Sequence, residues 1–322
     1  MNKKIVAYVV VGGIVALIIG AFFQAPSEVT VSHLDAGSKE ARPLQEQARR
    51  PQGSTHATPL PEVGAPLQLI EADLARRASE GDGGAACRLA LEYQRCALTE
   101  QRVENVDRMM AGSEPGEVPH RAALPLDPNG FYVDVSHCAG VVTPPATEIA
   151  ALWRSAAANG NSAAMTNYAV GNAFSVNNIL DSIDELKTYK ESAEAMAHQA
   201  AMAGDGGALL SLAGAYSPEN QVGLRSFLAQ AVRMDLTKAL ALYKTAYLGL
   251  NDDGAQEQMA VFIDERIAAL SKRASAAQVS QADAAARQLA GEIGSLRYPS
   301  SRSIAYLRLG RTVEPKVTDC GG

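Results

Sequence analysis

Four cysteines are the residues of this sequence whose type and spacing most directly predict covalent chemistry: Cys87, Cys96, Cys138 and Cys320. None forms a C-x-x-C pair, and an even number of cysteines in an oxidising compartment indicates disulfides. On one uninterrupted helix Cys87 and Cys96 would lie ~13 Å apart, which is beyond the ~7 Å between Cα atoms that a disulfide tolerates. We therefore expect Cys138 to pair with Cys96, or alternatively with Cys87. The first choice leaves Cys87 to pair with Cys320.

Other chemistry-bearing groups form no familiar arrangement. Three of the cysteines and His137 offer the ligand types of a zinc site, but their spacing does not match one. The sequence contains no H-E-x-x-H, G-x-S-x-G, Walker or S-x-x-K pattern, and its five histidines are scattered. Gly-Asp-Gly-Gly steps at Gly81 and Gly204 resemble phosphate loops, but no strand pattern precedes either. We expect no catalytic residue, no cofactor and no bound metal.

The composition indicates which elements must position these residues. The chain has 322 residues, including 57 alanines, and only 5% of the residues are aromatic. Alanine is the best helix former and a poor strand former, so an all-α fold with closely packed helices is expected. The net charge of −6 argues against a nucleic-acid partner.

The N-terminus has the pattern of a membrane anchor. Residues 5–23 form a run of 19 residues without a charge, which as a helix just spans a ~30 Å hydrocarbon core. Lys3 and Lys4 precede the run, so residues 1–4 are expected in the cytoplasm and the remainder across the membrane. The alternative is a cleaved signal peptide, whose apolar region is normally shorter, at about 7–15 residues.

A Pro-rich segment follows the anchor. Residues 24–66 contain six prolines, no aromatic residue and charges of both signs. Such a segment cannot bury enough apolar surface to offset the entropy of an ordered chain. We interpret it as a disordered tether between the anchor and the body.

The body from residue 67 onward contains a recurring pattern. Alanine stands three residues before a glycine and again four residues after it, and an apolar or aromatic residue stands at +8 with alanine at +9. The pattern centres on four glycines: Gly81, Gly160, Gly204 and, in a degenerate copy, Gly249. Glycine readily adopts the left-handed conformation that ends a helix, and the Asp or Asn after the first three begins another helix as its N-cap. Each copy therefore predicts a helix–turn–helix unit.

Large side chains at repeat positions predict a core. They lie on helix faces that the +4, +8 and +12 positions share, or on the helix that precedes the turn. We interpret five of them as core residues: Tyr93, Trp153, Tyr168, Tyr216 and Tyr243.

At these residues the chain resembles the Sel-one-like repeat family, which is related to the tetratricopeptide repeats. The D-x-x-K-A run at 235–239, Trp153, and the A-A-x-x-G-[DN] steps at 156–161 and 200–205 carry the resemblance, which covers residues 67–270 with gaps. It implies a right-handed α-solenoid that scaffolds protein contacts, often in bacterial envelopes. It implies no catalytic residues.

Two segments depart from the repeats. Residues 94–145 form an insertion in which we expect a helix at 97–111 and a short strand at 131–135. Because long insertions in repeat proteins often carry function, Phe131 and Tyr132 in that strand are candidate partner contacts. Residues 271–322 are expected to form C-terminal capping helices and a tail.

The predicted fold is therefore an all-α solenoid of helix–turn–helix repeats with one N-terminal transmembrane helix. The predicted protein is not an enzyme but a scaffold, anchored in a bacterial inner membrane, that binds an envelope protein in the periplasm. The alternative is an envelope enzyme, such as a peptidoglycan-active hydrolase, with its site in residues 94–145.

Overall fold

The computed structural model describes residues 59–111, 128–218, 226–251 and 256–321. Every regular element in these ranges is a helix, as the alanine-rich composition predicts. The α-helices are α2 (Leu67–Ser79), α3 (Gly83–Ala111), α4 (Pro128–Cys138), α5 (Ala146–Ala158), α6 (Ser162–Ala169), α7 (Ile183–Met202), α8 (Gly206–Tyr216), α9 (Phe227–Ala231), α10 (Leu236–Leu248), α11 (Glu257–Ser271), α12 (Ala276–Ile293) and α13 (Ile304–Arg308). Short 3₁₀ helices are η4 (Val176–Ser182), η7 (Ser301–Ser303) and η8 (Val317–Gly321).

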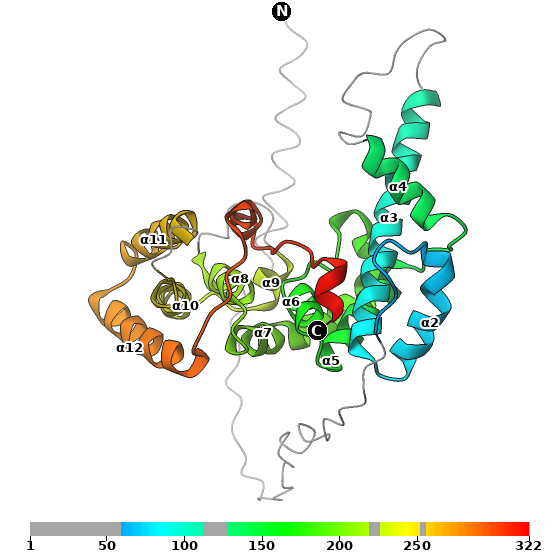
Figure 1. Ribbon diagram of the computed structural model, residues 1–322. Coiled ribbons are helices and arrows are strands. Elements are labelled where there is room, and N and C mark those ends of the chain that lie inside the picture. Colours follow the sequence, from blue (N-terminus) through cyan, green and yellow to red (C-terminus); the bar gives the residue numbers. More distant parts are fainter. Residues whose placement is uncertain (1–58, 112–127, 219–225, 252–255, 322) are drawn as a thin grey trace, which may run out of the picture. The chain divides into compact units, whose positions relative to one another are not determined.

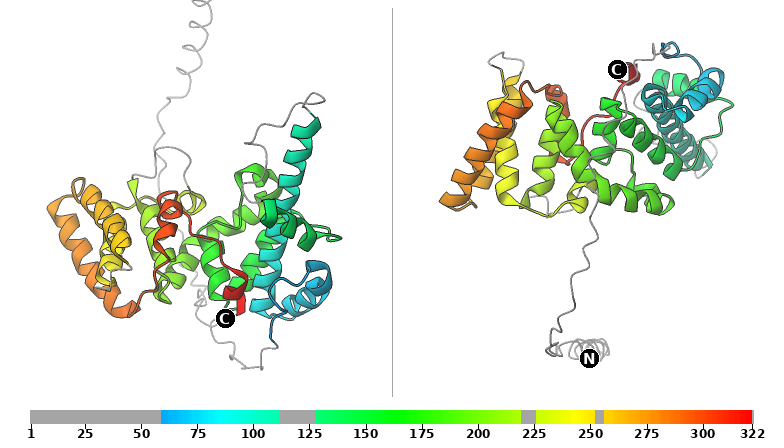
Figure 2. Two further views of the ribbon diagram at one scale, coloured as in Figure 1. Left: turned by 45° about the horizontal axis from the view of Figure 1, so that its top comes forward. Right: turned by 90° about the horizontal axis from the view of Figure 1, so that it is seen from below.

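Neighbouring helices pack against one another largely in chain order. The main contacts follow the series α2, α3, α5, α6, α7, α8, α10 and α11, and the additional helix α4 lies on α3 (Figure 1). In the right-hand view of Figure 2, α10–α12 lie at one end of the row and α2 and α3 at the other. Each of these helices is therefore covered by its neighbours in the sequence.

Three turns between these helices have the same backbone geometry. Gly81, Gly160 and Gly204 have φ of 91°, 86° and 87°, the left-handed values that favour glycine. At each turn the glycine N–H bonds the carbonyl three residues back, and the next N–H bonds the carbonyl five residues back. The Asp or Asn after each glycine then accepts a hydrogen bond from the N–H three residues later, at 2.9–3.0 Å. The predicted turn is confirmed at these three sites.

The fourth repeat glycine serves a different purpose. Gly249 is the C-cap residue of α10 and has φ −88°, so the expected left-handed turn does not form there. A Cβ at this position would lie 2.7 Å from Cδ1 of Leu296. At this glycine the end of α10 therefore approaches the C-terminal segment closely and makes no left-handed turn.

The aromatic residues predicted for the core are buried: Tyr93, Trp153, Tyr168, Tyr216 and Tyr243. Three of their hydroxyls donate to a glutamate on another helix, and these pairs are Tyr93–Glu71, Tyr168–Glu185 and Tyr216–Glu194. Burial and the neighbouring carboxylate raise the pKa of each of these three tyrosines above its ordinary value. The hydroxyls therefore remain protonated and keep adjacent helices in register.

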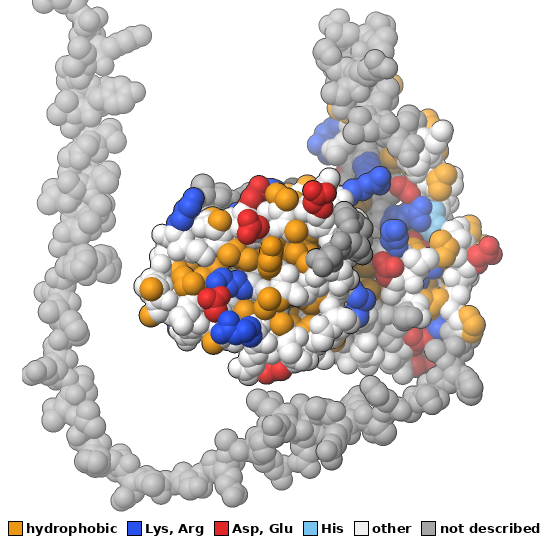
Figure 3. All heavy atoms as spheres, turned by 60° about the vertical axis from the view of Figure 1, so that its left-hand side comes forward, with side chains coloured by type: hydrophobic (Ala, Val, Ile, Leu, Met, Phe, Trp, Pro, Cys, Tyr) orange, Lys and Arg blue, Asp and Glu red, His pale blue; other side chains and the backbone are white. Residues whose placement is uncertain are grey.

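The far end of the row is covered by α12. This helix begins with a capping box between Ser275 and Gln278 and packs on α10 rather than on α11. Figure 3 looks onto this end, where hydrophobic side chains gather between basic and acidic ones.

The chain after α12 folds back over the earlier helices. We call residues 294–321 the C-terminal strap; it includes α13 and ends beside α3, α5 and α6 (Figures 1 and 2). Its polar contacts with the earlier helices include Arg297 with the backbone of Gly204 and Gly206, Thr312 with Asn172, and Cys320 with Asn161. A disulfide between Cys87 and Cys320 then joins the strap to α3 across 233 positions of sequence.

The N-terminal boundary of the body differs from the predicted one. Residues 59–66, which the sequence assigns to the tether, lie against the repeats, because Leu60 packs on the core and the Pro59 carbonyl accepts a hydrogen bond from Arg77. The expected anchor at 5–23 and the rest of the tether lie outside the described residues. Within the described residues, no helix combines the length and the apolar character that crossing a membrane requires.

Candidate functional site

The segment 131–135 is part of helix α4, so the predicted strand is wrong. Val133 and Val135 favour a strand by propensity, but contacts with α3 decide the outcome. Asp134 and His137 are three residues apart, a spacing that puts both side chains on one helix face and on opposite faces of a strand. Both bind α3, and only a helix allows them to do so together. Pro128 occupies the first helical position, where its missing N–H costs nothing.

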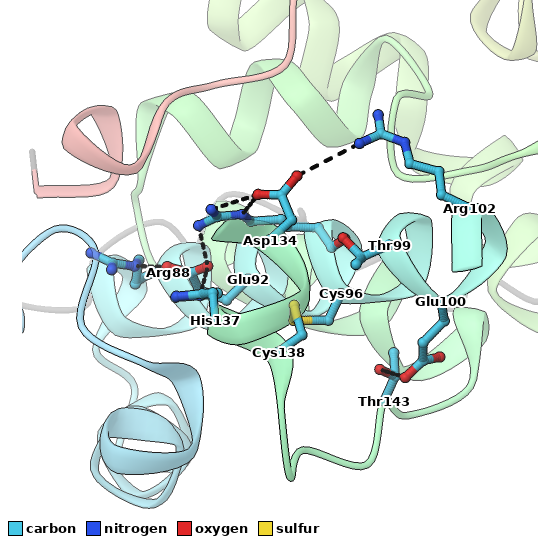
Figure 4. Close-up of a disulfide and its surroundings, with 11 residues drawn as sticks. Arg88, Glu92, Cys96, Thr99, Glu100, Arg102, Asp134, His137, Cys138 and Thr143 are labelled. Atoms are coloured by element: carbon cyan, nitrogen blue, oxygen red, sulfur yellow. Dashed lines mark hydrogen bonds and ion pairs between the residues drawn. A yellow bond between two sulfur atoms is a disulfide. The ribbon is translucent and has the colours of Figure 1, made fainter. Parts of the chain in front are cut away.

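A buried network of charged side chains joins α4 to α3 (Figure 4). Glu92 is fully buried; its Oε1 accepts a hydrogen bond from Arg88 Nε at 2.6 Å, and its Oε2 lies 2.8 Å from His137 Nε2. Nearer the surface, Arg95 makes a 2.6 Å ion pair with Asp134. Removing one member of a buried pair leaves its partner unpaired, which costs several kcal/mol, about 3–5. The network therefore fixes both the position and the rotation of α4.

A disulfide closes the same interface. Cys96 on α3 is bonded to Cys138 at the last residue of α4, as predicted. Because all four cysteines are in disulfides, the sulfurs of the alternative zinc site are already used. Among the residues that the structure describes, no group of three His, Cys, Asp or Glu side chains is arranged to hold a metal.

Helix α4 also carries apolar side chains that are exposed or half-buried. Tyr132 is 68% exposed and Val133 61% exposed, while Phe131 is half-buried beside them with its ring centroid 6.0 Å from that of Tyr132. Between α4 and the second half of α3 lies a shallow hollow of about 280 Å³, whose walls include Val103 and Val135. We call Phe131, Tyr132 and Val133 the α4 face.

The structure separates the predicted residues into two groups. The cysteine pair 96–138 and the candidate contacts Phe131 and Tyr132 come together at α4, whereas the repeat glycines and core aromatics lie in turns and in the interior. The sequence reasoning did not identify Arg88 and Glu92 as members of this site. Their spacing of four residues within a predicted buried helix is the signal that would have found them.

Comparison of the chain with protein-family models, with curated proteins and with solved structures finds no match.

Proposed function

We propose that the chain is a membrane-anchored scaffold of the bacterial periplasm, which holds another envelope protein on the α4 face. The proposal includes a body that is an α-solenoid of Sel-one-like repeats. Two observations support the solenoid: consecutive helices pack in chain order, and three turns share one hydrogen-bonding pattern. Residues 5–23 would provide the anchor, with residues 1–4 in the cytoplasm.

The observation that carries the proposal is an exposed apolar face on a rigidly held helix. Tyr132 and Val133 are consecutive residues of α4 and both are mostly exposed, although the same helix buries His137 and binds α3 through a disulfide. Adjacent exposed aromatic and aliphatic groups are typical of protein interfaces, where tyrosine is enriched. A helix that is already fixed loses little conformational entropy when a partner binds, so more of the contact energy contributes to affinity.

Binding is favoured over catalysis in the described part of the 94–145 insertion. A general acid or base must come within hydrogen-bond reach of its substrate. Glu92 and His137 are buried against each other, and Asp134 is paired with Arg95, so these groups are occupied in holding α4. This favours the scaffold over the alternative peptidoglycan-active hydrolase.

The binding proposal is tested by site-specific photo-crosslinking in cells that make the full chain. A photoreactive phenylalanine derivative replaces Tyr132 in one strain and Leu180 in a control strain. Leu180 is suitable because it is 78% exposed but lies on η4, outside the α4 face. We expect one discrete protein adduct from position 132 and none of that mass from position 180.

A second pair of variants measures the contribution of the contact. Val133→Ser should reduce the crosslink from position 132 several-fold, whereas Leu180→Ser should leave it unchanged. Equal adducts from positions 132 and 180, or an adduct that Val133→Ser does not weaken, would contradict the α4 face as the binding surface.

The anchor is tested by topology and mass. A reporter that is active only in the periplasm, fused after Gly322, should be active, and the mature chain should still begin near Met1. A mature chain that begins at Ala25 or Pro26 would show a cleaved signal peptide instead of an anchor.

A further inference from the structure

A second hollow of the body has no role in the proposed scaffold. Its volume is about 400 Å³, within the ~300–1,000 Å³ range of small-ligand sites. It is formed by segments that are distant in sequence: the middle of α3, the start of α5, the loop after α6, α9 and the C-terminal strap. None of its lining residues belongs to α4, so it is separate from the α4 face.

The floor of this hollow is apolar. Ile149 and Phe174 line it and are themselves only 5% and 2% exposed. Phe227 lies against Phe174 with ring centroids 5.5 Å apart, and Leu98, which is 40% exposed, forms part of the rim. These side chains offer a dry surface that suits an aliphatic group of a few carbons.

One cation faces this floor without an acidic partner. Arg311 Nε donates to Asn172 Oδ1 at 3.2 Å, and no carboxylate of the described residues lies within ion-pair distance of its guanidinium. Asn172 is itself held, because its amide N–H groups donate to the carbonyl and hydroxyl of Thr312 at 3.0 and 3.1 Å. Arg311 therefore has its orientation set by a neutral amide, and its terminal N–H groups remain available.

Among the described residues that line the hollow, Glu314 is the one acid, and one of its oxygens already has a hydrogen-bond partner. Glu314 Oε1 accepts a hydrogen bond from Gln94 Nε2 at 2.9 Å, and Gln94 in turn accepts one from the indole of Trp153 at 2.9 Å. A doubly charged anion such as phosphate would experience stronger repulsion from Glu314 than a single carboxylate, whose charge matches the single guanidinium. The second oxygen of Glu314 can accept an amide N–H of the ligand.

We propose that this hollow binds a carboxylate that carries a nearby branched apolar group. The carboxylate pairs with the Arg311 guanidinium, and the apolar group lies on Phe174, Phe227 and Leu98. Two sources have this chemistry: a free N-acylated amino acid, and the last residue of a polypeptide. The site is independent of the scaffold proposal, because loss of the α4 interaction would leave it intact.

The test is calorimetric titration of the full chain, purified in detergent with both disulfides intact. The probes are N-acetyl-leucine, its carboxamide, and a hexapeptide ending in Ala-Leu as the free acid and as the amide. Each acid should bind at least about 10-fold more tightly than its amide, since a charge-assisted hydrogen-bonded pair is lost in the amide. Tighter binding of the peptide acid than of N-acetyl-leucine would identify a polypeptide end as the source, and equal binding a free acid.

Matched variants distinguish the contribution of the Arg311 charge to binding from that of the apolar floor. Arg311→Gln should make acid and amide bind equally, whereas Arg308→Gln should change nothing, because Arg308 lies on the same strap but pairs with Glu265. Leu98→Ser should weaken both acids several-fold and keep the preference for acid over amide. Circular dichroism confirms that each variant is folded.

Three results would overturn the proposal. They are the absence of binding by either acid at millimolar concentration, equal affinity of acid and amide for the unmodified chain, and a preference for the acid that survives Arg311→Gln.

Discussion

Removing the Cys87–Cys320 disulfide should destabilise the body more than removing the Cys96–Cys138 disulfide. The two bonds close loops of 233 and 42 residues. In the chain-entropy description the longer loop restricts the unfolded chain more, and it gives about 5.5 kcal/mol for the first bond and about 4 kcal/mol for the second. The predicted difference in the free energy of unfolding is therefore about 1.5 kcal/mol. Replacing both cysteines of a pair with alanine avoids a free thiol and a buried hydroxyl, because Cys87, Cys96 and Cys320 are fully buried and Cys138 is partly buried.

Equilibrium unfolding in urea provides the measurement. Far-ultraviolet circular dichroism follows the helices, and fluorescence of Trp153, the single tryptophan, follows the junction with the strap. The probe is well placed because Trp153 is fully buried and its indole bonds Gln94, which in turn bonds Glu314 of the strap. Coincident transitions of the two signals would justify a single free energy for each variant.

The comparison between the two pairs is the critical result. If Cys96→Ala/Cys138→Ala lowers the free energy of unfolding as much as Cys87→Ala/Cys320→Ala, loop length does not control the stabilisation. In that case the disulfides would stabilise the body mainly through the contacts of α4 and not through closure of the long loop to the strap.

Two further predictions concern the turns and a histidine. Gly160→Ala should cost about 1–2 kcal/mol for its left-handed backbone alone, because no atom lies within 4 Å of the added Cβ. Gly204→Ala should cost at least about 1 kcal/mol more, since its Cβ would lie 2.7 Å from the Ser295 carbonyl oxygen of the strap; equal losses in thermal or urea unfolding would contradict this strap contact. Burial lowers the pKa of His198 below its ordinary value, so the unfolded chain binds the proton more readily and stability should fall as the pH drops through about 6.5. His198→Gln should flatten the dependence of the unfolding temperature on pH between about 7 and 5, and an unchanged slope would show that another group is responsible.

Features with a local signal could be predicted from the sequence. The glycine-centred turns follow from backbone preferences that act within a few residues, and the structure places Gly81, Gly160 and Gly204 in the expected conformation. A geometric restriction excluded one disulfide pairing, because Cys87 and Cys96 lie on one helix and cannot reach each other. It left Cys138 to pair with Cys96 or Cys87, and the structure shows the first choice. Both inferences needed only the helix itself and not its neighbours.

Features that depend on distant contacts could not be predicted in the same way. The valines of α4 indicate a strand, and the contacts of Asp134 and His137 with α3 overrule that preference. No short sequence pattern predicts that Arg311 lines the second hollow either, because Arg311 and its partner Asn172 are 139 positions apart in sequence. Only the return of the strap brings them together.

The return of the strap also explains the Gly-Asp-Gly-Gly steps that resemble phosphate loops. The first glycine of each step makes the turn, but the later glycines lie in helix starts, where glycine is a poor choice by propensity. A Cβ at Gly84 would lie 2.9 Å from the Cys320 carbonyl oxygen, and one at Gly206 would lie 2.9 Å from that of Arg297.

The remaining turn of this type provides the comparison. It reads Gly160-Asn161-Ser162 and has no second glycine. There the strap is met by a side chain instead, because the Asn161 amide donates to the Cys320 carbonyl at 3.0 Å. The extra glycines thus occur at the two turns where the strap backbone approaches the helix start, and at the third turn the strap is bound by the Asn161 side chain. We infer that Gly84 and Gly206 are required by the close approach of the strap, whereas a Cβ at Gly83 would instead meet the Asn159 carbonyl oxygen at the end of α5.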